Sequence, residues 1–202
     1  MDAADAHLRR VDPVMAALIE ANGELGPPLA FDGPYAALVR AIVGQQLSVR
    51  AAEAIHGRLL ERFGGHEPTP QELLDADPDA LRAAVGLSRA KMVFLRSLAE
   101  HVRSGALEID RLDELSDDEV SAELMAVKGI GAWTAQIFLM FQLGRPDVLA
   151  AGDLGIRRAV ERAYELPDLP STAELEAIAQ PWRPYRTRAC RHLWHSLQIE
   201  PV

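Results

Sequence analysis

The sequence predicts an all-α protein, and two observations carry this prediction. Apolar residues recur at three- and four-residue spacing through most of the 202-residue chain, while runs of β-branched residues are short. Several Ser, Thr or Asp residues are followed at once by proline, or three residues later by glutamate, and both patterns are typical of helix starts. We therefore expect about nine or ten helices joined by short loops, with no linker that would separate independent domains.

The first long helical segment runs from about residue 34 to residue 63 and is interrupted at Gly44. Helix starts are predicted further along the chain at Thr69, Asp77, Ser116 and Ser171. The residues that share one helical face after the interruption are Val49, Ala52, Ile55, Leu59 and Phe63. The glycines expected where helices stop are Gly64, Gly65, Gly86, Gly105 and Gly144.

The composition fits a water-soluble, cytoplasmic protein. With 49% hydrophobic residues, the chain can build one sizeable core or two small lobes. The single cysteine, Cys190, excludes a disulfide framework and an iron–sulfur cluster. The acidic residues 1–5 do not resemble a signal peptide, and no apolar stretch is long enough to span a bilayer. The net charge of −9 weighs against nucleic-acid binding unless one face is cationic.

The segment 116–143 carries the most informative pattern. A capped helix is expected to end near Val127, and a second to begin at about Ala132 after the turn that holds Gly129 and Gly131. Two glycines at this spacing permit a tight reversal with φ > 0 and leave backbone N–H groups unobstructed at a helix N-terminus. Such amides favour an anion, for example a phosphate, without any basic side chain. The alternative is a plain αα-hairpin that needs glycine only to turn.

A Gly/Pro-containing loop follows this hairpin, and the segment 144–158 then places Asp153 where a further helix opens. An aspartate here can be a simple helix cap, or it can present a fixed carboxylate to a ligand. The two interpretations are compatible because a capping position fixes the side chain. Asp147 is the nearest rival acid, but it precedes the apolar pair Val148 and Leu149 and does not open a helix.

A hairpin, a Gly/Pro loop and an aspartate in this order resemble the helix-hairpin-helix Gly/Pro-Asp (HhH-GPD) superfamily of DNA glycosylases. Segments 41–49, 124–135, 181–186 and 192–194 are similar, in the right order, to the 3-methyladenine DNA glycosylase II branch. The likeness covers about residues 34–198. It implies a two-lobed all-α fold with a DNA-binding cleft between the lobes, and one catalytic unit over residues 1–202. The chain resembles the compact form of that branch, without its N-terminal β-domain.

The resemblance implies that the protein is a monofunctional glycosylase for alkylated bases in double-stranded DNA, with Asp153 as the catalytic acid. Cleavage of an N-glycosidic bond develops oxocarbenium character at the sugar, and a carboxylate can stabilise that charge and position the attacking water. Trp133, Trp194 and Ile137 are expected to form the base pocket, where tryptophan rings suit a cationic methylated base. Core packing is the alternative for each tryptophan, and for Trp182 it is preferred.

The DNA contacts are expected on the interruption near Gly44 and on the hairpin. The residues assigned to them are Gln45, Gln46, Leu47, Lys128, Gly129, Gly131 and Thr134. Gln46 aligns best with the side chain that fills the gap left by an extruded base, with Leu47 next, while a surface glutamine pair is the alternative. No organic cofactor is required, but the carbonyls of Met125, Val127 and Ile130 are expected to suit a structural Na⁺ or K⁺.

Residues at three positions of the hairpin differ from those of many relatives, and the first of them bears on the reaction. Relatives that also cut the strand carry a lysine where this chain has Trp133, so no lyase activity is expected. Lys128 replaces the usual proline before the first hairpin glycine, and Ile137 stands where the branch often has an aromatic residue. The alternatives are an enzyme for uracil, etheno or oxidised bases, a catalytically silent DNA-binding protein, and a helical scaffold unrelated to DNA. We expect a monomer without membrane association.

Overall fold

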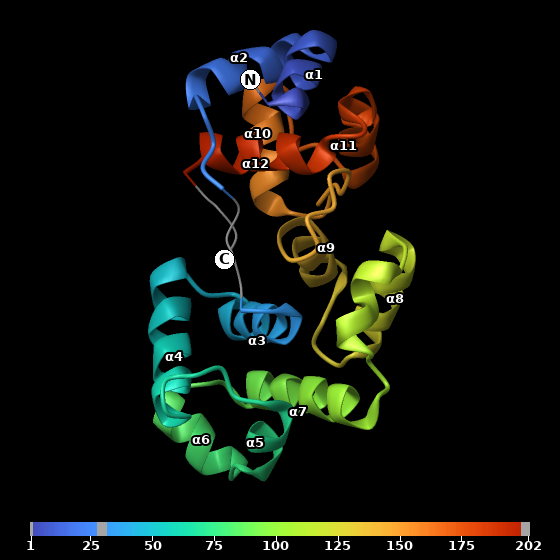
Figure 1. Ribbon diagram of the computed structural model, residues 1–202. Helices are drawn as coiled ribbons and strands as arrows, with labels where there is room; N and C mark the ends of the chain where they lie inside the picture. The colour runs from blue at the N-terminus through green and yellow to red at the C-terminus, as the bar shows by residue number, and fades with distance from the viewer. Residues whose placement is uncertain (1, 28–31, 199–202) are drawn as a thin grey trace. The chain divides into compact units, whose positions relative to one another are not determined.

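The structure is a computed structural model that describes residues 2–27 and 32–198. All regular secondary structure in these ranges is helical, which confirms the predicted all-α class. The chain forms two compact units, coloured along the sequence in Figure 1. Unit 1 combines Met1–Leu29 with Leu139–Pro201, and unit 2 is Ala30–Phe138. A single catalytic unit with a cleft stays a prediction.

Unit 2 contains six α-helices, one 3-10 helix and the start of another α-helix. Their bounds are α3 (Pro34–Gly44), α4 (Val49–Arg62), α5 (Pro70–Asp75), α6 (Pro78–Val85), α7 (Arg89–Ser104), η1 (Ile109–Glu114), α8 (Asp117–Ala126) and α9 (Ala132–Phe141). The predicted break at Gly44 is confirmed, since α3 ends there and α4 begins five residues later. The predicted hairpin bounds are confirmed as well, because α8 ends at Ala126 and α9 begins at Ala132.

The capping signals of the sequence correspond to real helix starts. Thr69, Ser116 and Ser171 each form a capping box with the glutamate three residues later, and Asp77 caps α6 with its side chain. Gly86 and Gly105 end α6 and α7 in the left-handed conformation. These features are local, so the sequence alone was sufficient to locate them.

Unit 1 is assembled from the two ends of the chain. Its elements are α1 (Ala3–Val11), α2 (Pro13–Asn22), α10 (Leu154–Ala163), α11 (Thr172–Ile178), η2 (Gln180–Trp182) and α12 (Arg186–Ser196). Twelve α-helices occur in the described ranges, more than the sequence predicted; the N-terminal pair α1 and α2 was not anticipated. No helix in the part that the structure describes is long and apolar enough to cross a membrane.

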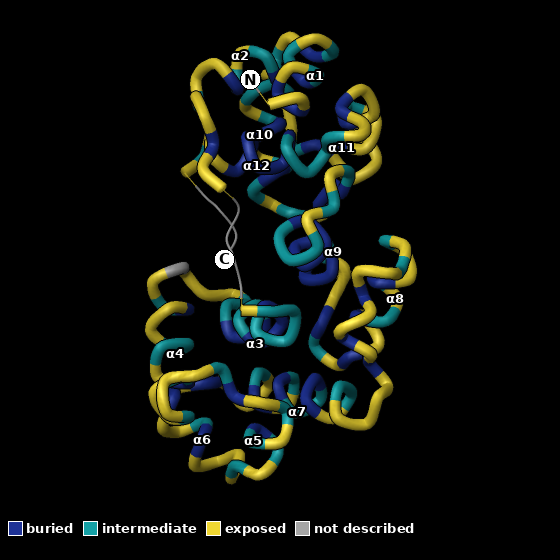
Figure 2. Tube along the Cα trace, in the orientation of Figure 1, coloured by how far each residue is buried: buried dark blue, intermediate teal, exposed yellow. Residues whose placement is uncertain are grey.

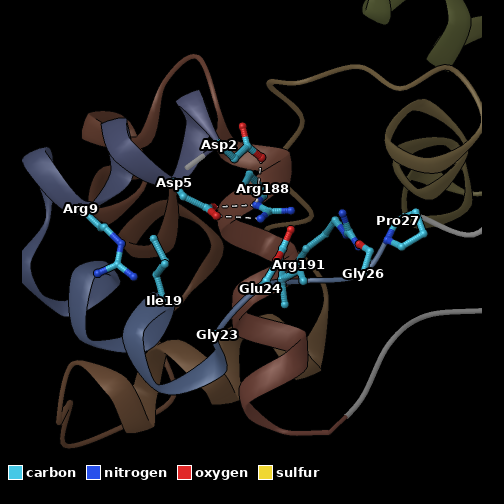
Figure 3. Close-up of a pocket in the computed structure, with 11 residues that line it drawn as sticks. Asp2, Asp5, Arg9, Ile19, Gly23, Glu24, Gly26, Pro27, Arg188 and Arg191 are labelled. Carbon is cyan, nitrogen blue, oxygen red and sulfur yellow. Dashed lines mark hydrogen bonds and ion pairs between the residues drawn. The ribbon is translucent and has the colours of Figure 1, made fainter.

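The centre of unit 1 is α12, whose residues 189–194 are all buried (Figure 2). A polar cluster on this helix joins it to α1 and α2. Arg188 donates two hydrogen bonds to the Asp5 carboxylate, at 2.6 and 2.7 Å, as Figure 3 shows. The fully buried His192 places Nε2 3.0 Å from Asp5 Oδ1, and its Nδ1 accepts from the Asn22 amide at 3.2 Å.

This arrangement favours neutral His192, because Asn22 presents a donor to Nδ1 and leaves no acceptor for a second ring proton. Burial lowers the pKa of His192 below its ordinary value, against the opposing hydrogen bond to Asp5. Burial alone would raise the pKa of Asp5, but hydrogen bonds from Arg188 and His192 lower it to about 2. The ion pair and the neutral imidazole therefore stabilise the attachment of α12 together.

A second buried aspartate joins α2, α10 and η2. Asp12 caps α2 through Oδ1, and its Oδ2 accepts from Tyr164 Oη at 2.5 Å and from Trp182 Nε1 at 2.8 Å. Trp182 is fully buried, which agrees with the core position preferred from the sequence. Tyr164 follows the last residue of α10, so this network holds the carboxyl end of that helix.

The first testable prediction concerns acid stability. The free energy of unfolding should fall as the pH drops below about 6.5, because the unfolded chain then binds a proton that the folded His192 site resists. Asp5 should add a further loss only as the pH falls from 3.8 toward about 2. Urea unfolding between pH 7 and pH 5 measures the first effect. His192→Gln should flatten that part of the curve, and identical curves for both proteins would contradict the prediction.

Candidate active site

Asp153 lies at the N-cap of α10, immediately after the Gly/Pro loop. Its Oδ1 accepts the backbone N–H of Ile156 at 2.8 Å, which fixes the carboxylate at the positive end of the helix dipole. The residue is half-buried, so solvent still reaches it. The predicted cap is confirmed, while the presentation of this carboxylate to a ligand stays a prediction.

Trp194 on α12 supplies a second donor to the same oxygen. Its indole Nε1 donates to Asp153 Oδ1 at 3.0 Å, and the residue is 1% exposed. The Phe141 ring lies 6.1 Å away between centroids, tilted by 34°. The sequence assigned Trp194 to a base pocket, and that role stays a prediction. The contacts instead tie the indole to the carboxylate, whose orientation it fixes.

Gly155 is a neighbour of this carboxylate that the sequence analysis missed. A Cβ atom at this position would lie 3.0 Å from Asp153 Oδ1 and 3.4 Å from Trp194 Cδ1. A glycine in the first turn of a helix is unfavourable by roughly 1 kcal/mol relative to alanine, and this cost was the available signal. The missing side chain lets the carboxylate and the indole pack this closely against the first turn of α10. Leu154 lies next to it and is 48% exposed.

The rival acid Asp147 forms ion pairs with two arginines. Its carboxylate accepts from Arg183 and Arg186, each at 2.7 Å, and Arg186 also donates to the Asp147 carbonyl. Thr187 reinforces the attachment, because its hydroxyl donates to the Arg145 carbonyl at 2.6 Å. These bonds fasten the Gly/Pro loop to the start of α12, so Asp147 is a structural ion-pair partner.

The hairpin turn in unit 2 departs from the expectation at one of its two glycines. Gly129 has φ +95°, and a Cβ atom there would lie 2.1 Å from Phe94 Cγ. Gly131 has no positive φ, and a Cβ atom would meet nothing within 4 Å. Only Gly129 is therefore required by the turn. Gly131 is exposed in front of α9, and the DNA contact expected of it stays a prediction.

The interruption between α3 and α4 is a tight turn, here called the Gln turn, formed by residues 44–47. Leu47 N–H donates to the Gly44 carbonyl at 3.1 Å, Gln45 has φ −49° and ψ 128°, and Gln46 has φ +57°. These values resemble a type II turn, which favours glycine at the position that Gln46 occupies. A non-glycine residue there stores about 1–3 kcal/mol of strain, a cost that clusters at functional sites.

The two glutamines of this turn differ in their surroundings. Gln46 is exposed at the tip, and the neighbouring Leu47 is among the exposed large apolar residues. Gln45 is half-buried, and its Nε2 donates to the Gly129 carbonyl at 2.9 Å. The sequence assigned Gln45 to DNA contact, which stays a prediction, but the structure gives its amide a partner within the protein.

The predicted site residues on α9 face mostly inward. Trp133 is half-buried, whereas Thr134 and Ile137 are buried, with Thr134 only 4% exposed. The phosphate contact expected of Thr134 stays a prediction. Lys128 is exposed on the hairpin turn, and its backbone N–H donates to Ser97 Oγ at 3.3 Å.

The predicted cation ligands lie around this turn, where the Val127 carbonyl accepts the Ile130 N–H at 3.1 Å. Within residues 2–27 and 32–198, no group of three or more His, Cys, Asp or Glu side chains could hold a metal ion. The Cys190 thiol is fully buried, and burial raises its pKa to about 12, so it cannot act as a nucleophile near neutral pH.

Fold and site together define an all-α protein with a helix-hairpin-helix turn and, after a Gly/Pro loop, a carboxylate fixed at a helix N-terminus. Residues 39–184 match the HhH-GPD superfamily base excision DNA repair protein family. The chain therefore belongs to this superfamily, as its motifs indicated.

Individual relatives agree. DNA-3-methyladenine glycosylase 1 of Schizosaccharomyces pombe is 34% identical over 97% of this chain and 87% of its own. A structure of the 3-methyladenine DNA glycosylase of that yeast with abasic DNA superposes with a TM-score of 0.90 and 33% identity, covering 100% of this chain and 99% of that one. A DNA-3-methyladenine glycosidase structure from Bacillus halodurans gives a TM-score of 0.85 and 37% identity, with 96% and 89% covered.

The second prediction compares the two buried tryptophans that donate to an aspartate. Trp194→Phe and Trp182→Phe each remove one indole bond to a carboxylate, so each should lower the free energy of unfolding by about 1.5–3 kcal/mol. Only Trp194→Phe should also slow the release of damaged bases, by about 10- to 100-fold, because it removes the indole bond to Asp153 Oδ1 and leaves that from the Ile156 N–H. Single-turnover kinetics with thermal unfolding test this. Equal rate losses in both variants would refute it.

The third prediction separates the hairpin glycines. Gly129→Ala should lower the free energy of unfolding by about 2–4 kcal/mol, because the positive φ and the contact with Phe94 both oppose a methyl group. Gly131→Ala should change it by less than about 0.5 kcal/mol. Chemical denaturation of both variants measures the difference, and a fully stable Gly129→Ala protein would contradict it.

Proposed function

We propose that this protein is a monofunctional DNA glycosylase that hydrolyses the N-glycosidic bond of alkylated bases in double-stranded DNA. The observation that carries the proposal is the Asp153 carboxylate, held by the Ile156 amide and the Trp194 indole directly after the Gly/Pro loop. The names of the relatives, which act on 3-methyladenine, support the choice of alkylated bases.

The carboxylate suits hydrolysis of an alkylated nucleotide. When the bond between C1′ and the base nitrogen breaks, its electron pair leaves with the base, and positive charge develops on the sugar. Asp153 stabilises that charge and accepts a proton from the water that attacks C1′. A base methylated on a ring nitrogen is cationic and leaves without further protonation. No metal ion is needed for this step.

The contacts with DNA in this proposal come from unit 2. The backbone amides at the hairpin, unobstructed at Gly131, bind a phosphate at the start of α9, and Lys128 adds one cationic side chain. Gln46 enters the gap left by the extruded base, since the strained Gln turn already presents it to solvent. The half-buried Trp133 stacks on the flipped base.

Strand cleavage is not part of the proposed activity. A lyase needs an amine that attacks the sugar, and Trp133 occupies the position where lyases of the superfamily carry lysine. The chain has two lysines, Lys91 and Lys128. Lys91 donates to the Val43 carbonyl at 2.7 Å and is thereby engaged in the protein. The reaction should stop at an abasic site.

Three finer points complete the proposal. A structural Na⁺ or K⁺ at the carbonyls of Met125, Val127 and Ile130 would strengthen the phosphate grip of the hairpin. The protein acts as a monomer. We propose the cytoplasm as its location.

The fourth prediction tests the reaction directly. Wild-type protein should release 3-methyladenine or 7-methylguanine from DNA treated with a methylating agent, with no strand break before alkali. Asp153→Asn keeps an oxygen for the Ile156 and Trp194 donors, so it should fold normally but lose at least about 100-fold in rate. Chromatography of the released bases and a gel before and after alkali measure both results.

Asp147→Asn is the matched control because it changes the rival acid of the same loop; it should lower the stability through its ion pairs with Arg183 and Arg186 but lose far less of the rate of base release than Asp153→Asn. If this variant lost activity while Asp153→Asn kept it, the assignment of the catalytic acid would be wrong. Binding of DNA without release of any methylated base would favour another lesion class or a silent DNA-binding protein.

A further inference from the structure

One face of α7 supports both segments that the proposed function assigns to DNA. Lys91, Phe94 and Ser97 follow one another at intervals of three residues and therefore share this face. Lys91 contacts the end of α3, Phe94 packs on Gly129, and Ser97 Oγ accepts the Lys128 N–H. The Gln turn and the hairpin are thus both attached to one helix.

The contact at Lys91 holds the start of the Gln turn. Val43 is the penultimate residue of α3, so no amide within the helix donates a hydrogen bond to its carbonyl. The amide that would reach it, Leu47 N–H, donates instead to Gly44. Lys91 Nζ fills this position at 2.7 Å, and a cation is favourable at the negative end of the α3 dipole. Partial burial lowers the pKa of the Lys91 ammonium.

The contact at Gln45 joins the two segments directly. Its Nε2 donates to the Gly129 carbonyl at 2.9 Å across 84 residues of sequence. Gly129 is also the residue against which Phe94 leaves no room for a side chain. The Gln turn and the hairpin are therefore connected in two ways, directly through Gln45 and indirectly through α7.

We propose that Gln45 and Lys91 are positioning residues that set Gln46 at a fixed place relative to the phosphate-binding hairpin before DNA arrives. This inference rests on the proposed function, because it presumes that Gln46 fills the gap beside an extruded base. A turn that is already ordered loses little entropy on insertion, so the cost of ordering falls on folding and not on DNA binding. Neither residue needs to touch DNA for this role.

The experiment measures insertion without base release. The probe is a DNA duplex with a tetrahydrofuran abasic-site analogue opposite 2-aminopurine, whose fluorescence changes when a side chain fills the gap. The variants are Gln45→Leu and Lys91→Met. The matched control is Arg58→Met, because Arg58 Nε likewise donates to a carbonyl in the last turn of a helix, that of Val85 in α6, at 2.8 Å. That helix does not lead into the Gln turn.

At saturating protein, wild type and Arg58→Met should give the same fluorescence change. Gln45→Leu and Lys91→Met should give a change at least about twofold smaller, because Gln46 is no longer held for insertion. Lys91→Arg, which restores a donor to the Val43 carbonyl, should recover the wild-type signal. Gln46→Gly should abolish the signal while leaving the protein at least as stable, since glycine relieves the positive φ.

The inference is overturned if Gln45→Leu and Lys91→Met give the wild-type fluorescence change. It is equally overturned if Arg58→Met loses the signal together with them, because the residues would then be merely structural. A protein that shows these differences but releases no methylated base would refute the proposed reaction and leave the positioning role intact. The two failures are thereby distinguishable.

Discussion

The hydrogen bond between the Trp194 indole and the Asp153 carboxylate is the contact on which the candidate active site depends. It fixes the start of α10 against α12, and the opposite end of α10 is held by the buried Asp12, which takes bonds from Tyr164 and Trp182. Each end of this helix thus rests on an aspartate that accepts a tryptophan N–H. Such charge-assisted bonds are directional, so the carboxylate of Asp153 is presented in one orientation before any substrate is present.

Three arginines of α12 bind groups within unit 1. Arg186 binds Asp147, Arg188 binds Asp5, and Arg191 donates to the Gly26 carbonyl at 2.6 Å. These side chains assemble unit 1. In a chain with a net charge of −9, the proposed grip on DNA uses backbone amides at the hairpin, whose dipoles attract a phosphate without adding a formal charge, together with Lys128.

Local features of the structure could be predicted from the sequence with some accuracy. The capping boxes, the break at Gly44, the hairpin and the cap at Asp153 each depend on residues within one helical turn of each other. The superfamily followed from the order of hairpin, Gly/Pro loop and aspartate. The count of helices was too low because the N-terminal pair was not anticipated. The expectation that both hairpin glycines serve the turn in the same way was wrong. Gly129 is obligatory because of Phe94, which is distant in sequence, whereas no such neighbour restricts Gly131.

The sequence by itself determined the helical class, the helix starts and the position of the acid, because helix signals act over three or four residues. Only the tertiary structure decided what each polar side chain does. It turned Gln45 toward the hairpin 84 residues away and left Gln46 exposed, and it buried Trp194 against an acid 41 residues earlier. Contacts between residues so far apart leave no periodic trace in the chain, since they depend on how the packed helices meet and not on local spacing.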